Sequence, residues 1–339
     1  MVGVPEFEVE VLEGLAPLAS AELAGSGVRV LAERPDGLLV QAPAGPGMLA
    51  GLRLATAVYR RLVFDVPRPR ALLGDAQFRA LAGAMREVIA SGGAFRGFRL
   101  AAAGSDSPVF RRLAAALAAA TGVAFDAVEG ELLVRVRKAR TGNGWEVLLR
   151  LTPRPLSART WRVCNRPGGL NATLAVAMNR VAGVAAGDRY LNLMCGSGTL
   201  LVERFLDGPA RALVGLDADA EALACARANL EAAGALEACR LLHADALAAP
   251  LEGGAFDVIT ADLPWGDAVG SHERNRELHP AVLAAAARLA APGARLVLLT
   301  HELRLFRAVL ERERRWRLER ELKVAHGGHF PHAYLLRLP

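Results

Sequence analysis

The stretch YLNLMCGSGTLLVE at residues 190–203 decides the fold of this chain. Tyr190 to Leu193 has the composition of a short buried strand, and the turn behind it carries Gly196 and Gly198 before an apolar helix that begins near Thr199. Glycines at such a junction let the backbone turn sharply and leave N–H groups exposed at the positive end of the helix. The stretch therefore predicts a site for a nucleotide-like ligand, although Gly-x-Gly after a strand also occurs in nicotinamide-binding and purely structural turns.

Three further strand-like stretches each lead to an acidic residue. Ala212 to Leu216 leads to Asp217, about twenty residues past Gly198, where a doubly wound sheet places the carboxylate that binds ribose hydroxyls. The other two lead to Asp245 and Asp262. Because open α/β sheets bind ligands at the carboxyl ends of their strands, the sequence predicts an α/β, Rossmann-like sheet with a ligand site at that edge.

Length and composition limit the class of protein. At 339 residues the chain exceeds the usual size of a single domain, and we expect about two or three domains that each bury a core. No uncharged run of about eighteen apolar residues occurs, and the N-terminus lacks a basic region followed by an apolar one. We therefore expect a soluble, cytoplasmic protein without membrane attachment.

The four cysteines show neither C-x-x-C pairing nor histidines at the spacing of a zinc site. They are Cys164, Cys195, Cys225 and Cys239. We therefore expect neither a disulfide nor a structural zinc ion, and no metal cofactor. His326, His329 and His332 surround a Gly-Gly turn, but without cysteine partners they favour a surface turn over a metal site.

The net charge of +6 is unevenly distributed. Residues 1–59 hold 3 basic and 7 acidic side chains, residues 60–160 hold 17 and 8, and residues 161–339 hold 21 and 20. The basic middle segment favours a surface that binds nucleic acid, because neutralised phosphates dominate such affinity; a solvated arginine-rich face is the alternative. The candidate RNA-binding residues are Arg111 and Arg112 on a predicted helix, and Arg135, Arg137, Lys138 and Arg140 on or beside a predicted strand.

The N-terminal half shows short α+β patterns. Phe7 to Leu12 alternates acidic and apolar residues, as a half-exposed strand does, and Met48 to Leu54 has the pattern of a helix. Pro67 and Pro69 mark a junction, and Thr152 to Pro167, with three prolines, is typical of a connection between domains. The sequence thus predicts two small domains before the nucleotide-binding sheet.

The order of these motifs carries a family resemblance. CGSGT at 195–199, then Asp217, then Asp245, then D-L-P-W at 262–265 resembles the class I S-adenosylmethionine-dependent methyltransferases. The D-L-P-W form, the basic N-terminal segment and the connector around Leu156 to Arg162 resemble the THUMP-domain tRNA guanine-N2 methyltransferases. The resemblance implies a ferredoxin-like domain at 1–65, a THUMP RNA-binding domain at 66–155 and a seven-stranded Rossmann-like catalytic domain at 156–339. It also implies tRNA as partner, and we expect a monomer.

Carried onto this sequence, the family's cofactor contacts fall on the glycine turn, the acids and their neighbours. They are Asn192, Met194, Cys195, Gly196, Ser197, Gly198, Thr199, Asp217, Ala218, Asp245, Ala246 and Asp262. The target base falls on Asp262, Leu263, Pro264 and Trp265. The chain departs from the family at Asn192-Leu193, where members usually have Asp-Pro. An asparagine can contact the methionine part of the cofactor by hydrogen bonds but supplies no charge.

The residues support this chemistry independently. Methyl transfer from a sulfonium to an exocyclic amine is an in-line displacement that depends on positioning. Asp262 and the carbonyl of Leu263 can accept hydrogen bonds from the amine, and Trp265 offers a face for an extruded purine, worth about 1 to 3 kcal/mol. No covalent nucleophile is needed. Methylation of a pyrimidine carbon would need a cysteine near this loop, which has none, and Cys195 is interpreted as a packing residue.

We therefore predict a tRNA guanosine N2-methyltransferase that uses S-adenosylmethionine. By resemblance, its target is a guanosine in the acceptor stem, and position 6 is the specific expectation. The alternatives within enzymes are an rRNA guanine-N2 enzyme, one that acts on another tRNA guanosine, and a protein-glutamine methyltransferase, which leaves the basic segment unexplained. From another class, an inactive RNA-binding protein of methyltransferase fold has Asn192 as its only support.

Overall fold

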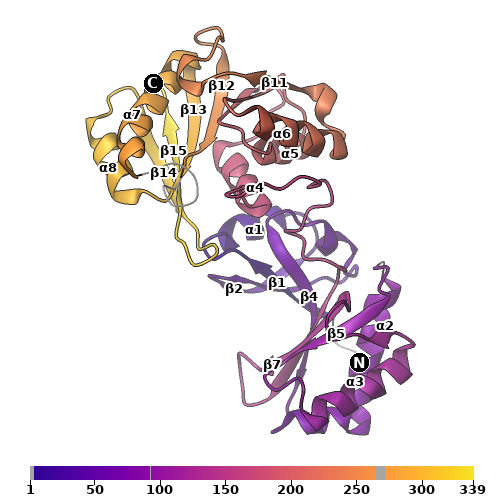
Figure 1. The fold of residues 1–339 in the computed structure, drawn as a ribbon. Coiled ribbons are helices and arrows are strands. Elements are labelled where there is room, and N and C mark those ends of the chain that lie inside the picture. The colour runs from indigo at the N-terminus through magenta and orange to yellow at the C-terminus, as the bar shows by residue number, and fades with distance from the viewer. Residues whose placement is uncertain (1–3, 92, 265–271) are drawn as a thin grey trace. The chain divides into compact units, whose positions relative to one another are not determined.

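The computed structural model describes residues 4–91, 93–264 and 272–339. The chain divides into two compact units. The N-terminal unit comprises Met1–Val11 and Leu15–Ser157, and the C-terminal unit comprises Leu12–Gly14 and Ala158–Pro339. Each unit contains one large β-sheet (Figure 1).

The described part of the N-terminal unit holds an eight-stranded sheet in the order β2-β3-β1-β4-β8-β7-β5-β6. Its strands are β1 (Glu6–Val11), β2 (Arg29–Arg34), β3 (Gly37–Gln41), β4 (Ala55–Phe64), β5 (Gly97–Ala101), β6 (Ala124–Phe125), β7 (Leu132–Lys138) and β8 (Trp145–Arg150). Its helices are α1 (Ala16–Glu22), η1 (Gly47–Gly51), η2 (Pro69–Leu73), α2 (Asp75–Ala90) and α3 (Pro108–Thr121). α1 packs against β2 and β3, and α2 packs against β4 and β8.

Two predictions about this unit change in detail. The helix expected over Met48–Leu54 is the short 3-10 helix η1, because the glycines at both of its ends disfavour a longer α-helix. β4 pairs with β8 across Tyr59–Phe64, so residues on both sides of the predicted boundary near residue 65 share one sheet. The separate ferredoxin-like and THUMP domains stay predictions.

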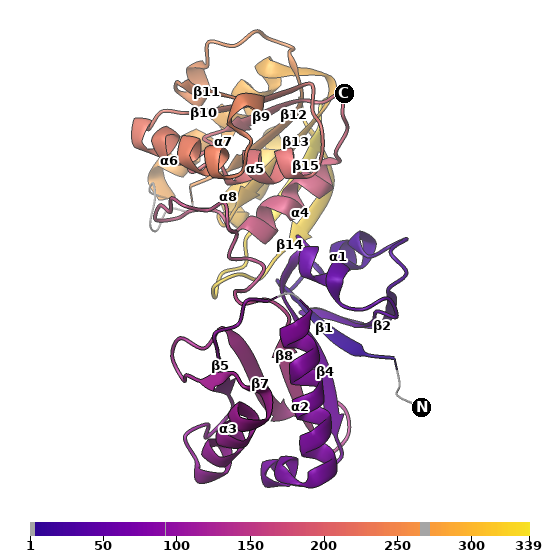
Figure 2. The same ribbon diagram turned by 90° about the vertical axis from the view of Figure 1, so that its right-hand side faces the viewer.

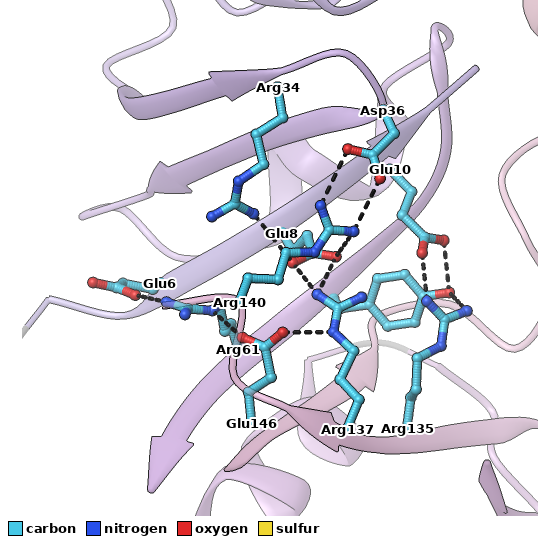
Figure 3. Close-up of polar contacts among 11 residues, drawn as sticks. Glu6, Glu8, Glu10, Arg34, Asp36, Arg61, Arg135, Arg137, Arg140 and Glu146 are labelled. Atoms are coloured by element: carbon cyan, nitrogen blue, oxygen red, sulfur yellow. Dashed lines mark hydrogen bonds and ion pairs between the residues drawn. The ribbon is translucent and has the colours of Figure 1, made fainter. Parts of the chain in front are cut away.

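One face of this sheet carries an ion-pair network (Figure 3). Glu6, Glu8 and Glu10 share this face because alternate residues of a strand point the same way. Arg61 of β4 contacts Glu6 at 2.8 Å and Glu146 of β8 at 2.9 Å. The half-exposed acidic face expected for residues 7–12 is therefore wrong at Glu8, whose side chain is only 4% exposed.

The arginines of β7 complete the network. Arg137 contacts Glu8 at 2.7 Å and Glu146 at 2.5 Å, and Arg135 pairs with Glu10 (Figure 3). Arg140 donates to both carboxylate oxygens of Asp36, and these hydrogen bonds hold the pKa of Asp36 below its ordinary value. The acidic first segment and the basic middle segment thus neutralise each other in part within one sheet.

The described part of the C-terminal unit holds a seven-stranded sheet in the order β11-β10-β9-β12-β13-β15-β14. Its strands are β9 (Arg189–Leu193), β10 (Ala212–Asp217), β11 (Cys239–His243), β12 (Phe256–Asp262), β13 (Ala290–Thr300), β14 (Arg317–Lys323) and β15 (His332–Arg337). Its helices are α4 (Ala172–Ala182), α5 (Thr199–Leu206), α6 (Ala220–Ala232), η3 (Leu236–Ala238), η4 (Ala246–Ala248), α7 (His272–Leu289) and α8 (Leu303–Arg312). β9 to β13 are parallel, and β15 is antiparallel to both of its neighbours.

Helices cover both faces of this sheet (Figure 1 and Figure 2). The alternation along β9 shows why: the Tyr190 hydroxyl donates to Asn179 of α4, whereas Leu191 and Leu193 belong to the core cluster that contains Val282 of α7. The predicted α/β, Rossmann-like architecture is confirmed. Among the described residues, no helix has both the length and the apolar surface needed to cross a membrane.

The prediction of no disulfide is wrong. Cys164 and Cys225 are bonded, with their Cα atoms 5.4 Å apart and a separation of 61 positions in sequence. Asn229 of α6 explains the approach, since its side-chain oxygen accepts from the N–H groups of Val163 and Cys164 and its amide donates to the Cys164 carbonyl. The spacing of the cysteines along the chain does not reveal such hydrogen bonds, so it could not predict the pairing. Cys195 and Cys239 are free.

Candidate active site

The glycine turn joins β9 to α5 as predicted. Met194, Gly196 and Gly198 all have positive φ, at 50°, 53° and 77°. Gly198 packs tightly on α6, where an added Cβ would lie 3.1 Å from the Ala226 side chain, whereas an added Cβ at Gly196 would meet no atom within 4 Å. The second glycine therefore serves helix packing, and the first leaves space above the turn.

That space is part of a cavity of about 690 Å³ at the carboxyl edge of the sheet. Of the predicted cofactor and base residues that the structure describes, all but Gly198 line it. They are Asn192, Met194, Cys195, Gly196, Ser197, Thr199, Asp217, Ala218, Asp245, Ala246, Asp262, Leu263 and Pro264. The volume lies within the range of about 300 to 1,000 Å³ typical of small-molecule sites.

Asp217 and Asp245 stand at the ends of β10 and β11. The Asp217 carboxylate accepts the Gly196 N–H at 2.8 Å and the Asp219 N–H at 2.9 Å, so it fixes the glycine turn as well as lining the cavity. Asp245 caps η4 by accepting the Leu247 N–H at 2.9 Å. Both acids are thus oriented by backbone donors, and neither forms a salt bridge with an arginine among the described residues.

Asn192 lies under the cavity and is 1% exposed. Its amide donates to the carbonyls of Leu193 and Thr260, and Thr260 in turn donates to the buried Tyr190 hydroxyl. Its Oδ1 has no hydrogen-bond partner in the described chain. A buried acceptor costs about 1 to 3 kcal/mol when unpaired, so this oxygen is a position where a ligand donor fits.

The loop after β12 begins at the cavity. The Leu263 N–H donates to Leu299 of β13 at 2.9 Å, and the Pro264 carbonyl accepts from Asn275 of α7 at 2.9 Å. These bonds fix the backbone that follows Asp262. Trp265 lies outside the described residues, and its stacking role stays a prediction.

Burial gives Cys195 the packing role expected of it. The side chain is 6% exposed, and desolvation with the nearby Asp217 charge raises the pKa of the thiol above its ordinary range. A neutral buried thiol is a poor nucleophile.

One wall of the cavity was missed by the sequence analysis. The segment from Arg166 to Asn171 lines it, with Arg166 paired to Asp219 at 2.5 Å. Asn171 caps α4 by accepting the Thr173 N–H at 2.8 Å. Asn229 also reaches the glycine turn by donating to the Ser197 carbonyl. The Pro-Gly-Gly sequence followed by a capping asparagine was a signal that could have marked this wall.

The histidine turn lies at the surface as expected, with Gly327, Gly328 and His329 exposed. His326 and His329 also line the cavity, which the local sequence does not predict, and His332 is buried against Glu321. The reason is topological, since β14 and β15 bring the turn to the sheet edge that carries the glycine turn.

The candidate RNA-binding residues fall into two groups. Arg111 and Arg112 are exposed on α3 and have no carboxylate partner among the described residues, and the exposed Lys138 lies over the Trp145 ring at 4.8 Å. Arg135, Arg137 and Arg140 are held in the ion-pair network (Figure 3). An RNA contact remains a proposal for all six.

Comparison with known families agrees with the geometry. A family model described as UPF0020, RMKL-like, methyltransferase domain, matches residues 159–332. A Thermus thermophilus protein named tRNA (guanine(6)-N2)-methyltransferase is 32% identical over 344 residues, which cover 98% of this chain and 96% of that relative. The Bos taurus U6 snRNA (guanine-N(2))-methyltransferase THUMPD2 is 36% identical over 112 residues, 33% of this chain. The match spans only 22% of the length of that mammalian relative.

A solved structure matches over the same extent. The crystal structure of TrmN from Thermus thermophilus superposes with a TM-score of 0.77 at 29% identity and covers 99% of this chain and 100% of its own. A structure titled as SMU.472, a putative methyltransferase complexed with SAH, gives a TM-score of 0.73 at 14% identity, 99% coverage of this chain and 98% of its own. The second likeness concerns the fold alone.

Proposed function

The chain belongs to the UPF0020 family of RMKL-like methyltransferase domains, and from this premise we propose that it is an S-adenosylmethionine-dependent tRNA guanosine N2-methyltransferase. The observation that carries the proposal is the cavity. It brings the glycine turn, the acids Asp217 and Asp245 and the segment from Asp262 to Pro264 to one edge of one sheet.

The residues around the cavity fit the cofactor. Asp217 would accept hydrogen bonds from the ribose hydroxyls, and Asp245 with Ala246 would flank the adenine. The unpaired Oδ1 of Asn192 would accept from the amino group of the methionine part. S-adenosylmethionine supplies the methyl group as an electrophilic sulfonium.

The loop after β12 would hold the acceptor. Asp262 and the Leu263 carbonyl accept hydrogen bonds from the exocyclic amine of a guanine and direct the nitrogen lone pair along the line of displacement. The bonds from Leu263 to Leu299 and from Asn275 to Pro264 hold this backbone before the base arrives. Such preorganised acceptors cost no reorganisation during the reaction.

The N-terminal unit would bind the tRNA. Arg111 and Arg112 on α3 are exposed cations suited to phosphates, and the relative that aligns over nearly the whole chain is named for guanine 6 of tRNA. We extend that name to a guanosine in the acceptor stem, with position 6 as the specific target. The mammalian U6 snRNA relatives share only a third of this chain, which favours tRNA.

The test is mass spectrometry of nucleosides from tRNA incubated with the protein and S-adenosylmethionine. We expect N2-methylguanosine at position 6. Asp262→Ala should lower turnover by about 10²- to 10³-fold, far more than it lowers tRNA or cofactor affinity, because the side chain acts on the extruded base. A methylated adenosine or cytidine contradicts the amine-holding role, whereas N2-methylguanosine elsewhere contradicts only the position. No cofactor binding in a calorimetric titration would support an inactive RNA-binding protein instead.

A further inference from the structure

The turn between β14 and β15 is a two-residue hairpin. The His326 N–H donates to the His329 carbonyl at 2.9 Å, and the His329 N–H returns a bond to the His326 carbonyl at 3.0 Å. Gly327 and Gly328, between them, have φ of 59° and 82°. Positive φ at both central positions is the type I′ geometry that glycine pairs favour. The positions of the two histidines are therefore fixed by the backbone.

The two imidazoles share one side of the hairpin. Residues directly opposite in an antiparallel bridge project their side chains to the same face, and His326 is bridged to His329. Both residues, with Gly327, line the cavity that holds the glycine turn and Asp262. The His301 ring, just after β13, meets the His329 ring edge-on at 5.0 Å. His329 is thus packed against the end of the neighbouring strand.

Strand order places this hairpin on the base side of the cavity. β10 and β11, which carry Asp217 and Asp245, lie on one side of β9 and β12. β13, β15 and β14 lie on the other side. His332, at the start of β15, pairs with Thr300 at the carboxyl end of β13, so the hairpin stands at the ligand-binding edge beyond Asp262. In this order β12, which ends in Asp262, lies between the hairpin and the strands that carry Asp217 and Asp245.

We propose that His326 and His329 recognise the Watson–Crick edge of the target guanine, with an imidazole N–H donating to its O6. The inference rests on the proposed function and adds a recognition element for O6, the group that distinguishes guanine from other purines that carry a 2-amino group. In the proposed function Asp262 and Leu263 bind the 2-amino group. O6 lies on the opposite side of N1 from that group, so a donor for O6 must come from a second part of the cavity wall, beyond Asp262 in the strand order. Burial and the neighbouring His329 lower the pKa of His326, so its ring is neutral near pH 7 and keeps one donor nitrogen.

The test compares two nucleotides at the target position of one ligated tRNA: guanosine and 2-aminopurine riboside. The second keeps the 2-amino group but carries a hydrogen atom in place of O6, so the imidazole donor has no acceptor. We expect the intact protein to prefer guanosine in kcat/KM, and His326→Leu or His329→Leu to reduce that preference by about 10- to 100-fold. Comparing preferences between variants cancels the difference in unpairing the two nucleotides. S-adenosylhomocysteine affinity, measured by calorimetry, should stay within about twofold.

His332→Leu is the matched control, because His332 is buried against Glu321 on the same hairpin and does not line the cavity. Its guanosine preference should equal that of the intact protein. The inference is overturned if both cavity variants keep the full preference, if the His332 variant loses it equally, or if the cavity variants lose cofactor affinity instead. An intact protein that binds S-adenosylhomocysteine yet makes no N2-methylguanosine overturns the proposed function itself.

Discussion

Both units bury polar side chains, but the sheet face of the N-terminal unit and the cavity of the C-terminal unit satisfy them in different ways. On the sheet face of the N-terminal unit, the buried carboxylates Glu8 and Glu146 are matched by arginines of neighbouring strands. Around the cavity of the C-terminal unit, Asp217 is oriented by backbone N–H groups, and Asn192 keeps an acceptor with no partner among the described residues. The difference indicates that the paired groups of the sheet face stabilise the fold, whereas the groups around the cavity are positioned to bind a ligand.

The largest expected effect tests the first half of this comparison. Glu146→Leu should lower the free energy of unfolding by about 3 to 5 kcal/mol, because it removes the buried carboxylate that Arg61 and Arg137 share. Urea unfolding of the full chain, followed by circular dichroism, measures the change. Glu6→Gln is the control, since Glu6 is 35% exposed and its pair is worth at most about 1 kcal/mol. An unchanged stability in the Glu146 variant would contradict a structural role for the network.

His279 of α7 is a buried polar group that neither pairs nor lines the cavity. It is 0% exposed, neither ring nitrogen has a partner in the described chain, and burial lowers its pKa to about 4. Below about pH 6.5 His279 is protonated in the unfolded chain but not in the folded chain. The free energy of unfolding therefore falls from pH 6.5 towards pH 4.

The loss from this group should reach at most about 3 kcal/mol at the acid end. His279→Leu should flatten this part of the pH dependence in urea unfolding at pH 7 and pH 4.5, with cofactor affinity unchanged at pH 7. A variant whose pH dependence matches that of the intact protein would assign the loss to other groups.

Asp217→Ala tests the second half of the comparison. Removing the carboxylate should weaken S-adenosylmethionine binding by about 1.5 to 3 kcal/mol, because a charge-assisted hydrogen-bond pair to the ribose is lost. Isothermal titration calorimetry gives the value, and urea unfolding should show a smaller change than in the Glu146 variant. An unchanged affinity would remove Asp217 from the cofactor site.

The smallest effect concerns the exposed arginines. Replacing Arg111 and Arg112 together by Gln should weaken tRNA binding several-fold and lower the slope of log affinity against log salt by up to about two, as the loss of two phosphate contacts requires. Filter binding over a salt series measures both. Arg140→Gln is the comparison, because Arg140 is already paired with Asp36 and should change the slope less. Equal slopes in the two variants would contradict the distinction between paired and unpaired arginines.

The sequence predicted the parts of the site that depend on local pattern. The glycine turn, Asp217 and Asp245 lie where a strand ends in the chain, so strand periodicity locates them. The hairpin at His326 and the wall at Arg166 reach the cavity only through the pairing of distant strands and through Asn229. The partners Glu8 and Arg137 are 129 residues apart, which is why counting charges along the chain predicted a basic surface where the sheet holds ion pairs.

The bond between Cys164 and Cys225 closes a covalent ring that contains β9, the glycine turn and Asp217 but leaves Asp245 and Asp262 outside. The Arg166 wall lies inside this ring, held at Cys164 by the bond and at Asn171 by the cap of α4. The Arg166 wall therefore loses its conformational freedom when the chain folds. Ligand binding does not have to order this segment, so no conformational entropy cost of the wall reduces the affinity. The part of the cavity formed by the Arg166 wall, the glycine turn and Asp217 is therefore ordered before a ligand binds. The part formed by Asp245 and Asp262 lies on elements that the ring does not constrain.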